Sequence, residues 1–215
     1  MYKICIIMLC FLSFFSCKKN SDNMIDLSGT ISDKINSFPI EGVNVLLEIK
    51  PFGGSSFSNS FDEITTTETN TNGEYLFSFQ NSNAVEYRLT FTKQGCFSEQ
   101  IVINPDQLSI SDNNVIDATL YSSSYLVLNI TNNTPFNNDD QITLNTTLIG
   151  ANVGSCFNNI VTMVGSSVDT TIECEVYGNQ MIEIDYFVTK DNFTNAFSDN
   201  VFCSSGDTLF KYINY

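Results

Sequence analysis

The sequence has no histidine and no tryptophan, and only 9 lysines and arginines stand against 24 aspartates and glutamates. Histidine is the most frequent general base and the usual partner of a serine or cysteine nucleophile. Its absence excludes serine triads, Cys–His pairs and His-ligated metal sites, and leaves carboxylate chemistry and oxygen-ligated calcium as candidates. The absence of tryptophan weakens a carbohydrate-binding function, although tyrosine and phenylalanine rings can still stack on sugars.

The shortage of basic residues gives the chain a net charge of −15. An acidic surface repels phosphate backbones, so we expect no nucleic-acid partner. Charged residues make up only 15% of the chain, while Asn, Ser and Thr are abundant, a composition that suits strands and turns better than long helices. The 215 residues, with 18 Phe and 9 Tyr, are enough for one large domain or for two small domains with real cores.

The first residues have the composition of a secretory signal. The positive start Met1–Lys3 precedes an apolar stretch from Ile4 to Phe15, about half the ~20 residues that a membrane-spanning helix needs. The sequence that follows, Phe14-Phe15-Ser16-Cys17, resembles a bacterial lipobox, and Lys18-Lys19 resembles what often follows one. The alternative is an ordinary secretory signal with a chance cysteine.

The lipobox resemblance implies that the thiol of Cys17 receives a diacylglyceryl group and that its freed amine is acylated. Several acyl chains on one residue are enough for stable membrane anchoring. We therefore expect a signal peptide over residues 1–16 and a lipidated cysteine with a polar tether over 17–24. The protein is expected to be an outer-membrane lipoprotein of a Gram-negative bacterium, either periplasmic or surface-exposed.

Residues 25–121 alternate apolar and polar side chains with the period of two that marks half-buried strands. The alternation is clear along 43–49, 75–79 and 87–91, and further strands are expected near 26–32, 62–69, 98–103 and 114–120. Asn72-Gly73 predicts a tight hairpin turn, because both residues tolerate positive φ. About seven strands at this spacing predict a β-sandwich.

Three segments of this region resemble a known family: LSGTISDKINSFPIEGVNVLLE, TTTETNTNGEYLFSF and EYRLTFTKQGCFSEQIVI. With Gly29, Pro39–Val43, the Thr69–Tyr75 hairpin and Tyr87–Gly95, they resemble a carboxypeptidase regulatory-like domain. The resemblance implies a prealbumin-like seven-strand sandwich that serves as an accessory module and has no catalytic residues. We expect Tyr75 and Tyr87 to bury their rings and to keep their hydroxyl groups in water.

Residues 122–215 also alternate, along 126–130, 142–146, 172–176, 182–186 and 209–215. Turn residues gather at 132–140, 165–166, 178–179, 190–192 and 204–207. This half resembles no family. The whole sequence thus predicts an all-β protein with two tandem Ig-like or prealbumin-like β-sandwich domains, over 25–121 and 122–215.

Cys96, Cys156, Cys174 and Cys203 remain outside the signal and Cys17, and the envelope permits disulfides. Four cysteines allow three complete pairings. We favour Cys156–Cys203, because both lie beside turn residues within one domain, and expect Cys174, on an apolar strand face, to be a buried thiol. A metal–thiolate site is not expected, since the chain has no CxxC pair and no histidine.

Three phenylalanines lie in or beside a Gly/Ser-rich loop: Phe52, Phe57 and Phe61. They form either a mobile apolar contact loop or, as is usual for such residues, the rim of the sandwich core. Paired carboxylates at Glu173/Glu175 and Glu183/Asp185 have a strand spacing that could suit glycoside hydrolysis, but solvated strand faces have the same pattern. Asp139 and Asp140 could hold calcium, or simply form a turn.

These observations predict a membrane-anchored envelope lipoprotein that acts as a non-catalytic binding or scaffolding module for an unknown protein or glycan. No catalytic residue, metal or cofactor is expected. The alternatives are a carboxylate-based glycan-acting enzyme that works through the second domain, and a simple structural spacer.

Overall fold

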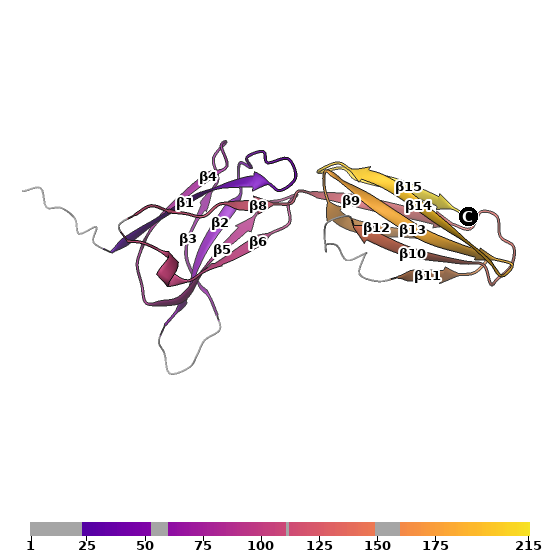
Figure 1. The fold of residues 1–215 in the computed structure, drawn as a ribbon, viewed down its shortest axis with the longest axis horizontal. Coiled ribbons are helices and arrows are strands. Elements are labelled where there is room, and N and C mark those ends of the chain that lie inside the picture. The colour runs from indigo at the N-terminus through magenta and orange to yellow at the C-terminus, as the bar shows by residue number, and fades with distance from the viewer. Residues whose placement is uncertain (1–22, 53–59, 111, 149–159) are drawn as a thin grey trace, which may run out of the picture.

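The computed structural model describes residues 23–52, 60–110, 112–148 and 160–215, and the elements below belong to these ranges (Figure 1). The described chain is built from strands, with a single 3-10 turn, and it forms two β-sandwiches that follow one another (Figure 1). The predicted all-β sandwich class is confirmed.

The first sandwich contains eight strands and the 3-10 turn η1. One sheet has the order β4-β1-β7, with β8 also paired to β1, and the other has the order β3-β2-β5-β6. The bounds are β1 Met24–Asp33, β2 Asn44–Pro51, β3 Asp62–Glu68, β4 Glu74–Gln80, β5 Ala84–Thr92, β6 Glu99–Ile103, η1 Pro105–Gln107, β7 Asn114–Val115 and β8 Ala118–Leu120.

Alternation determines which side chains enter this core. On β2, Val45 and Leu47 are fully buried, and on β4 the inward residues are Tyr75, Phe77 and Phe79. Burying one such side chain contributes about 1.5–3 kcal/mol relative to leaving it in water. The aromatic rings meet edge to face, as in the pair of Tyr75 and Phe77 with centroids 5.8 Å apart.

The two tyrosine hydroxyl groups differ from the prediction, because both are hydrogen-bonded to the backbone. The hydroxyl of Tyr75 donates to the carbonyl of Ile116 at 2.7 Å, and that of Tyr87 donates to the carbonyl of Ser82 at 3.3 Å. A buried hydroxyl needs a partner, and here backbone carbonyls supply it in place of water. Burial raises the pKa of Tyr75 far above its ordinary value of 10.0, with a smaller contribution from the charge of Asp117.

The second sandwich has the sheets β11-β10-β13-β14 and β12-β9-β15. Strand β15 runs parallel to β9, and the other pairings are antiparallel. The bounds are β9 Ser123–Thr131, β10 Gln141–Leu148, β11 Val161–Val164, β12 Asp169–Tyr177, β13 Gln180–Lys190, β14 Phe193–Cys203 and β15 Thr208–Asn214.

The core of the second sandwich lies between β9 and β13, the central strands of its two sheets. Leu126, Leu128 and Ile130 of β9 face Ile182 and Ile184 of β13, and all five side chains are almost completely buried. Turns lie where Asn and Gly were expected to allow them, as at Asn179 (φ 58°) and Gly206 (φ 75°). Strands β11 and β14 are additions that the alternation did not predict.

Within the described ranges, the structure contains no helix with the length and apolar character needed to span a bilayer.

Candidate functional site

The predicted contact loop is only partly described, since Phe57 lies outside the described residues. Phe52 is exposed, with 71% of its surface in contact with solvent. Phe61 is half-buried, and its ring lies 3.9 Å from the guanidinium carbon of Arg88. Phe61 therefore covers a side chain of its own sandwich, and Phe52 is the described member of the loop that is open to a partner.

Arg88 is in turn paired with Glu48 on the outer face of the first sandwich. Its Nε and Nη2 donate to the two oxygens of Glu48, each at 2.7 Å, and the hydroxyl of Thr90 donates to the same carboxylate at 3.2 Å. These hydrogen bonds, first of all that of Arg88, hold the pKa of Glu48 below its ordinary value, although desolvation opposes them. A forked arginine–carboxylate pair under an aromatic ring is a rigid structural feature.

The cysteines correct the predicted pairing. Cys203 is a free thiol, fully buried at the end of β14, so the predicted Cys156–Cys203 bridge is wrong; Cys156 lies outside the described residues. Cys174, predicted to be a buried thiol, is disulfide-bonded, and Cys96 is a second free thiol. Burial raises the pKa of Cys203 to about 11. Adjacency to turn residues was a poor guide, because the last position of β14 points into the core and buries the thiol there.

The two carboxylate pairs are not brought together. Glu173 and Glu175 are exposed on β12, while Glu183 and Asp185 lie on β13, which belongs to the other sheet. On both strands the intervening residues point into the core, as Cys174 and Ile184 do, so the carboxylates face outward from opposite sheets. Each pair therefore lies on the outward face of its own strand, as on a solvated strand face, and the two pairs do not meet at one site.

Asp140 is fully buried, and its carboxylate organises the turn between β9 and β10. It accepts hydrogen bonds from Asn132 Nδ2 and from the backbone N–H of Phe136, both at 2.8 Å, and from the N–H of Asn137 at 3.2 Å. Burial by itself raises the pKa of Asp140, but these hydrogen bonds and nearby Lys190 together hold it below its ordinary value. The oxygens that were candidates for calcium therefore accept protein N–H groups.

Asp139 does not join Asp140, since its side chain is exposed and its backbone N–H donates to Asn137 at 2.8 Å. Within the described ranges, no group of three or more cysteine or carboxylate side chains is gathered in a way that could hold a metal ion.

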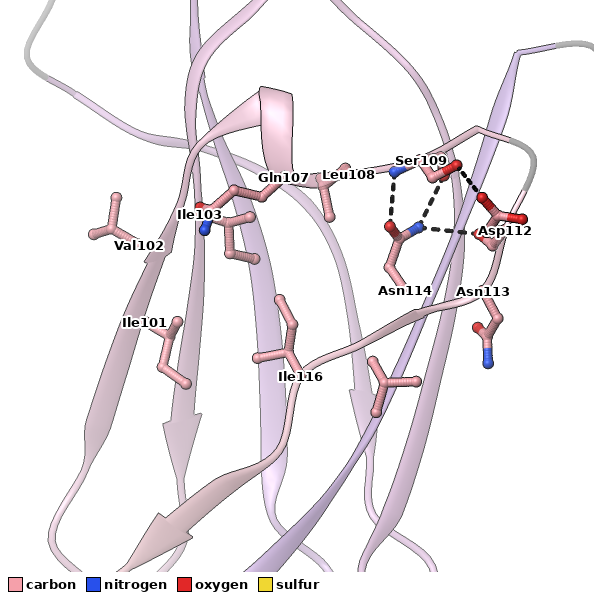
Figure 2. Close-up of a pocket in the computed structure, with 11 residues that line it drawn as sticks. Ile101, Val102, Ile103, Gln107, Leu108, Ser109, Asp112, Asn113, Asn114 and Ile116 are labelled. Carbon is pink, nitrogen blue, oxygen red and sulfur yellow. Dashed lines mark hydrogen bonds between the residues drawn. The ribbon is translucent and has the colours of Figure 1, made fainter.

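A groove of about 520 Å³ lies on the first sandwich between β6 and β7 (Figure 2). Both strands are sheet edges, so the two sheets are open to each other on this side. Its apolar lining consists of Ile101, Val102, Ile103, Leu108 and Ile116 (Figure 2). Apolar clefts with a few fixed polar groups are the usual form of ligand sites.

The polar end of the groove is held by Asn114. Its Oδ1 accepts from the N–H of Ser109 at 2.7 Å, and its Nδ2 donates to the carbonyls of Asp26 and Ser109 at 2.8 and 2.9 Å (Figure 2). The hydroxyl of Ser109 donates to Asp112 at 2.9 Å. These hydrogen bonds are made within the protein, and the apolar side chains beside them give the groove a surface that a partner could cover.

The junction of the two sandwiches is also closely built. Tyr177, from the second sandwich, stacks on Tyr121 with ring centroids 3.7 Å apart and meets Phe97 edge to face at 4.9 Å. Ser122 lies between β8 and β9, Ser123 and Ser124 begin β9, and all three are buried.

The backbone of this connection is bonded to both sandwiches. The N–H of Ser123 donates to the carbonyl of Gly95 in the first sandwich at 2.8 Å, and its carbonyl accepts from Gly206 in the second at 2.8 Å. The carbonyl of Ser122 accepts from the N–H of Gly178 at 2.7 Å. A Cβ at Gly178 would lie 2.7 Å from the Cα of Ser205, so this close approach requires glycine. The junction therefore has no free linker, and no local pattern in the sequence indicated it.

No protein-family model matches the chain, and no curated protein matches it, so the likeness to carboxypeptidase regulatory-like domains stays a prediction. Among solved structures, the chain is similar to the Bacillus anthracis TIE protein, at 10% identity and a TM-score of 0.36, with 89% of this chain and 34% of that one covered. It thus spans about a third of that protein.

Two further similar structures are pilins. A variant of the shaft pilin SpaA from Lactobacillus rhamnosus GG matches at 10% identity and a TM-score of 0.34, with 89% of this chain and 98% of that one covered. A minor pilin of Streptococcus agalactiae matches at 14% identity and a TM-score of 0.34, with 88% and 94% covered.

Proposed function

We propose that this chain is a lipid-anchored envelope protein whose two sandwiches form a stiff, non-catalytic scaffold. The observation that carries the proposal is the junction, where stacked tyrosines and backbone hydrogen bonds replace a flexible linker. A flexible tether between two domains would need exposed, Gly- or Ser-rich chain, whereas Ser122–Ser124 are buried. Two sandwiches joined rigidly in this way keep a fixed distance between the two ends of the molecule.

The positions of the chain ends fit this function. Strand β1 begins at the end of the first sandwich that lies farther from the second, and β15 ends at the far end of the second sandwich (Figure 1). An anchor at Cys17 would hold the first sandwich close to the membrane and project the second away from it. The acidic chain, with a net charge of −15, would itself be repelled by an anionic membrane surface.

The scaffold also offers surfaces for a protein or glycan partner. The groove between β6 and β7 has an apolar lining, and Phe52 is exposed on the same sandwich. Glu173 and Glu175 face outward on one sheet of the second sandwich, and Glu183 and Asp185 face outward on the other. These features support holding or presenting a partner over chemical turnover.

Lipid labelling tests the anchor. Cells that express the full chain should incorporate labelled palmitate into it, and the Cys17→Ser variant should not. Label that persists in Cys17→Ser would reject the anchor.

Scattering and an activity screen test the stiff, non-catalytic scaffold. Small-angle X-ray scattering of the soluble Cys17→Ser chain should give a single elongated form. Scattering that requires a broad ensemble of interdomain angles would reject the stiff scaffold. A glycan-hydrolysis screen that finds turnover abolished by Glu173→Gln would overturn the non-catalytic role.

A further inference from the structure

Three reactive side chains meet at one end of the second sandwich, and each is placed by the end of a strand. Asn132 directly follows β9, Asp140 directly precedes β10, and Lys190 is the last residue of β13. Strands β9 and β13 belong to different sheets, so the amide and the amine approach each other across the sandwich. Asn132 is 7% exposed and Asp140 is fully buried.

The three side chains are within reach of one another. Lys190 Nζ donates to Asn132 Oδ1 at 3.0 Å, and Asn132 Nδ2 donates to Asp140 Oδ2 at 2.8 Å. The same Oδ2 lies 3.9 Å from Lys190 Nζ. The ammonium also donates to the carbonyl and the hydroxyl of Thr134, and the ring of Tyr215 lies 5.1 Å from it. An amine, a carboxamide and a carboxylate are thus held together; the carboxamide and the carboxylate are buried, and the Lys190 side chain is 22% exposed.

We propose that Lys190 and Asn132 form an intramolecular amide bond, with Asp140 as the proton carrier. Asp140 Oδ2 takes a proton from the Lys190 ammonium, and the freed amine attacks the carboxamide carbon of Asn132. The bond from that carbon to Nδ2 breaks, and Asp140 returns the proton to the leaving nitrogen. The products are a Lys190–Asn132 amide and ammonia, which takes up the remaining amine proton as ammonium. Atoms and charge balance without any further reactant.

Asp140 Oδ2 is hydrogen-bonded to the leaving nitrogen at 2.8 Å and lies 3.9 Å from the attacking one, so a small shift of Lys190 Nζ would bring one oxygen within reach of both. General acid–base catalysis requires this reach, and holding an amine against its acceptor raises its effective concentration by several orders of magnitude. The burial of Asn132 and Asp140 limits the access of water to the carboxamide and so protects it from hydrolysis.

Lys211 provides a comparison on the neighbouring strand. Its Nζ contacts the carboxylate of Asp199, so its partner is a carboxylate and not a carboxamide. Lys211 should therefore stay a free amine while Lys190 does not.

The amide would join the two sheets of the second sandwich by a covalent bond and close a loop from 132 to 190. The inference does not rest on the membrane anchor, since it concerns one end of the second sandwich alone. It would make this sandwich resistant to opening between its sheets, because the strands at that end could no longer separate.

A peptide map of the full chain tests the proposal. After reduction and alkylation, trypsin and a glutamate-specific protease separate Asn132 from Lys190 in a linear chain, through cleavage after Glu173, Glu175 and Glu183. The expected product is instead a branched peptide that contains both residues, has lost the mass of one ammonia and is uncut after Lys190. Lys190→Arg and Asp140→Asn should give linear peptides, while Lys211→Arg should keep the branched one.

The peptide map of the wild-type chain alone shows whether the Lys190–Asn132 amide is present, so this test does not depend on the folding of any variant. If the folded wild-type chain releases both residues in linear peptides, with trypsin cutting after Lys190, the amide bond is ruled out. A branched peptide that persists in Asp140→Asn would remove Asp140 from the reaction.

Discussion

Tyr177 and Tyr121 lie face to face across the junction of the two sandwiches, with ring planes only 7° apart. Tyr121 follows β8 and Tyr177 ends β12, so the stack joins the last strand of the first sandwich to an outer strand of the second. Stacked rings contribute about 0.5–1.5 kcal/mol beyond the area that they bury. The contact therefore couples the stability of the two sandwiches as well as their orientation.

The junction predicts that Tyr177→Ala uncouples the sandwiches. We expect a loss of about 1–3 kcal/mol in the free energy of unfolding, from the lost stack and the lost contact with Phe97. Differential scanning calorimetry should show the melting transitions of the two sandwiches moving apart. Tyr212→Ala, at a ring that is 65% exposed on β15, is the matched control and should leave the transitions unchanged. If both substitutions changed the melting transitions equally, the stack of Tyr121 and Tyr177 would not couple the stability of the two sandwiches.

A second prediction concerns Gly29 in the middle of β1. A Cβ at this position would lie 1.9 Å from the carbonyl oxygen of Ile116 and 2.8 Å from the ring of Tyr75. The oxygen cannot move away easily, because it accepts the hydrogen bond of the buried Tyr75 hydroxyl. Gly29→Ala should therefore lower the free energy of unfolding by about 1–3 kcal/mol or more, as measured by urea denaturation.

The control for Gly29 is Leu76→Ala on the neighbouring strand β4. Leu76 is 63% exposed, so its truncation should change the stability by only a few tenths of a kcal/mol. A Gly29→Ala chain as stable as the Leu76→Ala chain would contradict the close approach of Ile116, between β7 and β8, to β1.

The thiols give a third prediction, since they differ in exposure and in bonding. Cys96 is half-buried and lines a shallow depression beside Phe97, whereas Cys203 is fully buried and its pKa is raised to about 11. Without reductant, iodoacetamide should label Cys96 in the native chain, Cys203 only after unfolding, and Cys174 in neither state. Peptide mass spectrometry reads each site separately. Labelling of Cys174 in the unreduced, unfolded chain would contradict its disulfide.

The strands with clean alternation could be predicted from the sequence, because burial on one face is a local property. Val43, Val45 and Leu47 share a face in the sequence, and all three are fully buried. Strand β14 was missed because Asn195 and Asp199 occupy positions that alternate in phase with Val201 and Cys203. The partner of Asp199 is Lys211 on β15, and a pattern within β14 cannot reveal that partner.

The candidate sites depended on contacts between distant residues and were therefore harder to predict. The turn at 132–140 could be recognised from its Asn and Asp residues, but calcium and hydrogen-bonding roles for Asp140 look alike locally. What distinguishes them is Lys190 on another strand and the backbone N–H groups that point at the carboxylate. The stack of Tyr121 and Tyr177 likewise leaves no periodic signal in either segment.

The last prediction is that stability falls in acid partly through Glu48. The folded-state pKa of Glu48 lies below its ordinary value of 4.5, chiefly through the hydrogen bond of Arg88. A carboxyl whose pKa is lowered by folding contributes stability that is complete above its unfolded pKa. That contribution is lost as the pH falls below 4.5 and through the folded pKa, because the unfolded state then binds the proton first.

Glu48→Gln should therefore be less stable than the wild type at neutral pH, and the difference between the two chains should shrink as the pH falls below 4.5. Urea denaturation at a series of pH values measures both midpoints. Asp140 has a lowered pKa as well, so some acid sensitivity should remain in the variant. Glu68→Gln, at an exposed side chain of β3, should follow the wild-type curve. A difference in urea midpoint between Glu48→Gln and wild type that is the same at every pH would contradict this. It would show that the pair with Arg88 acts through shape and packing, and not through the charge of the carboxylate.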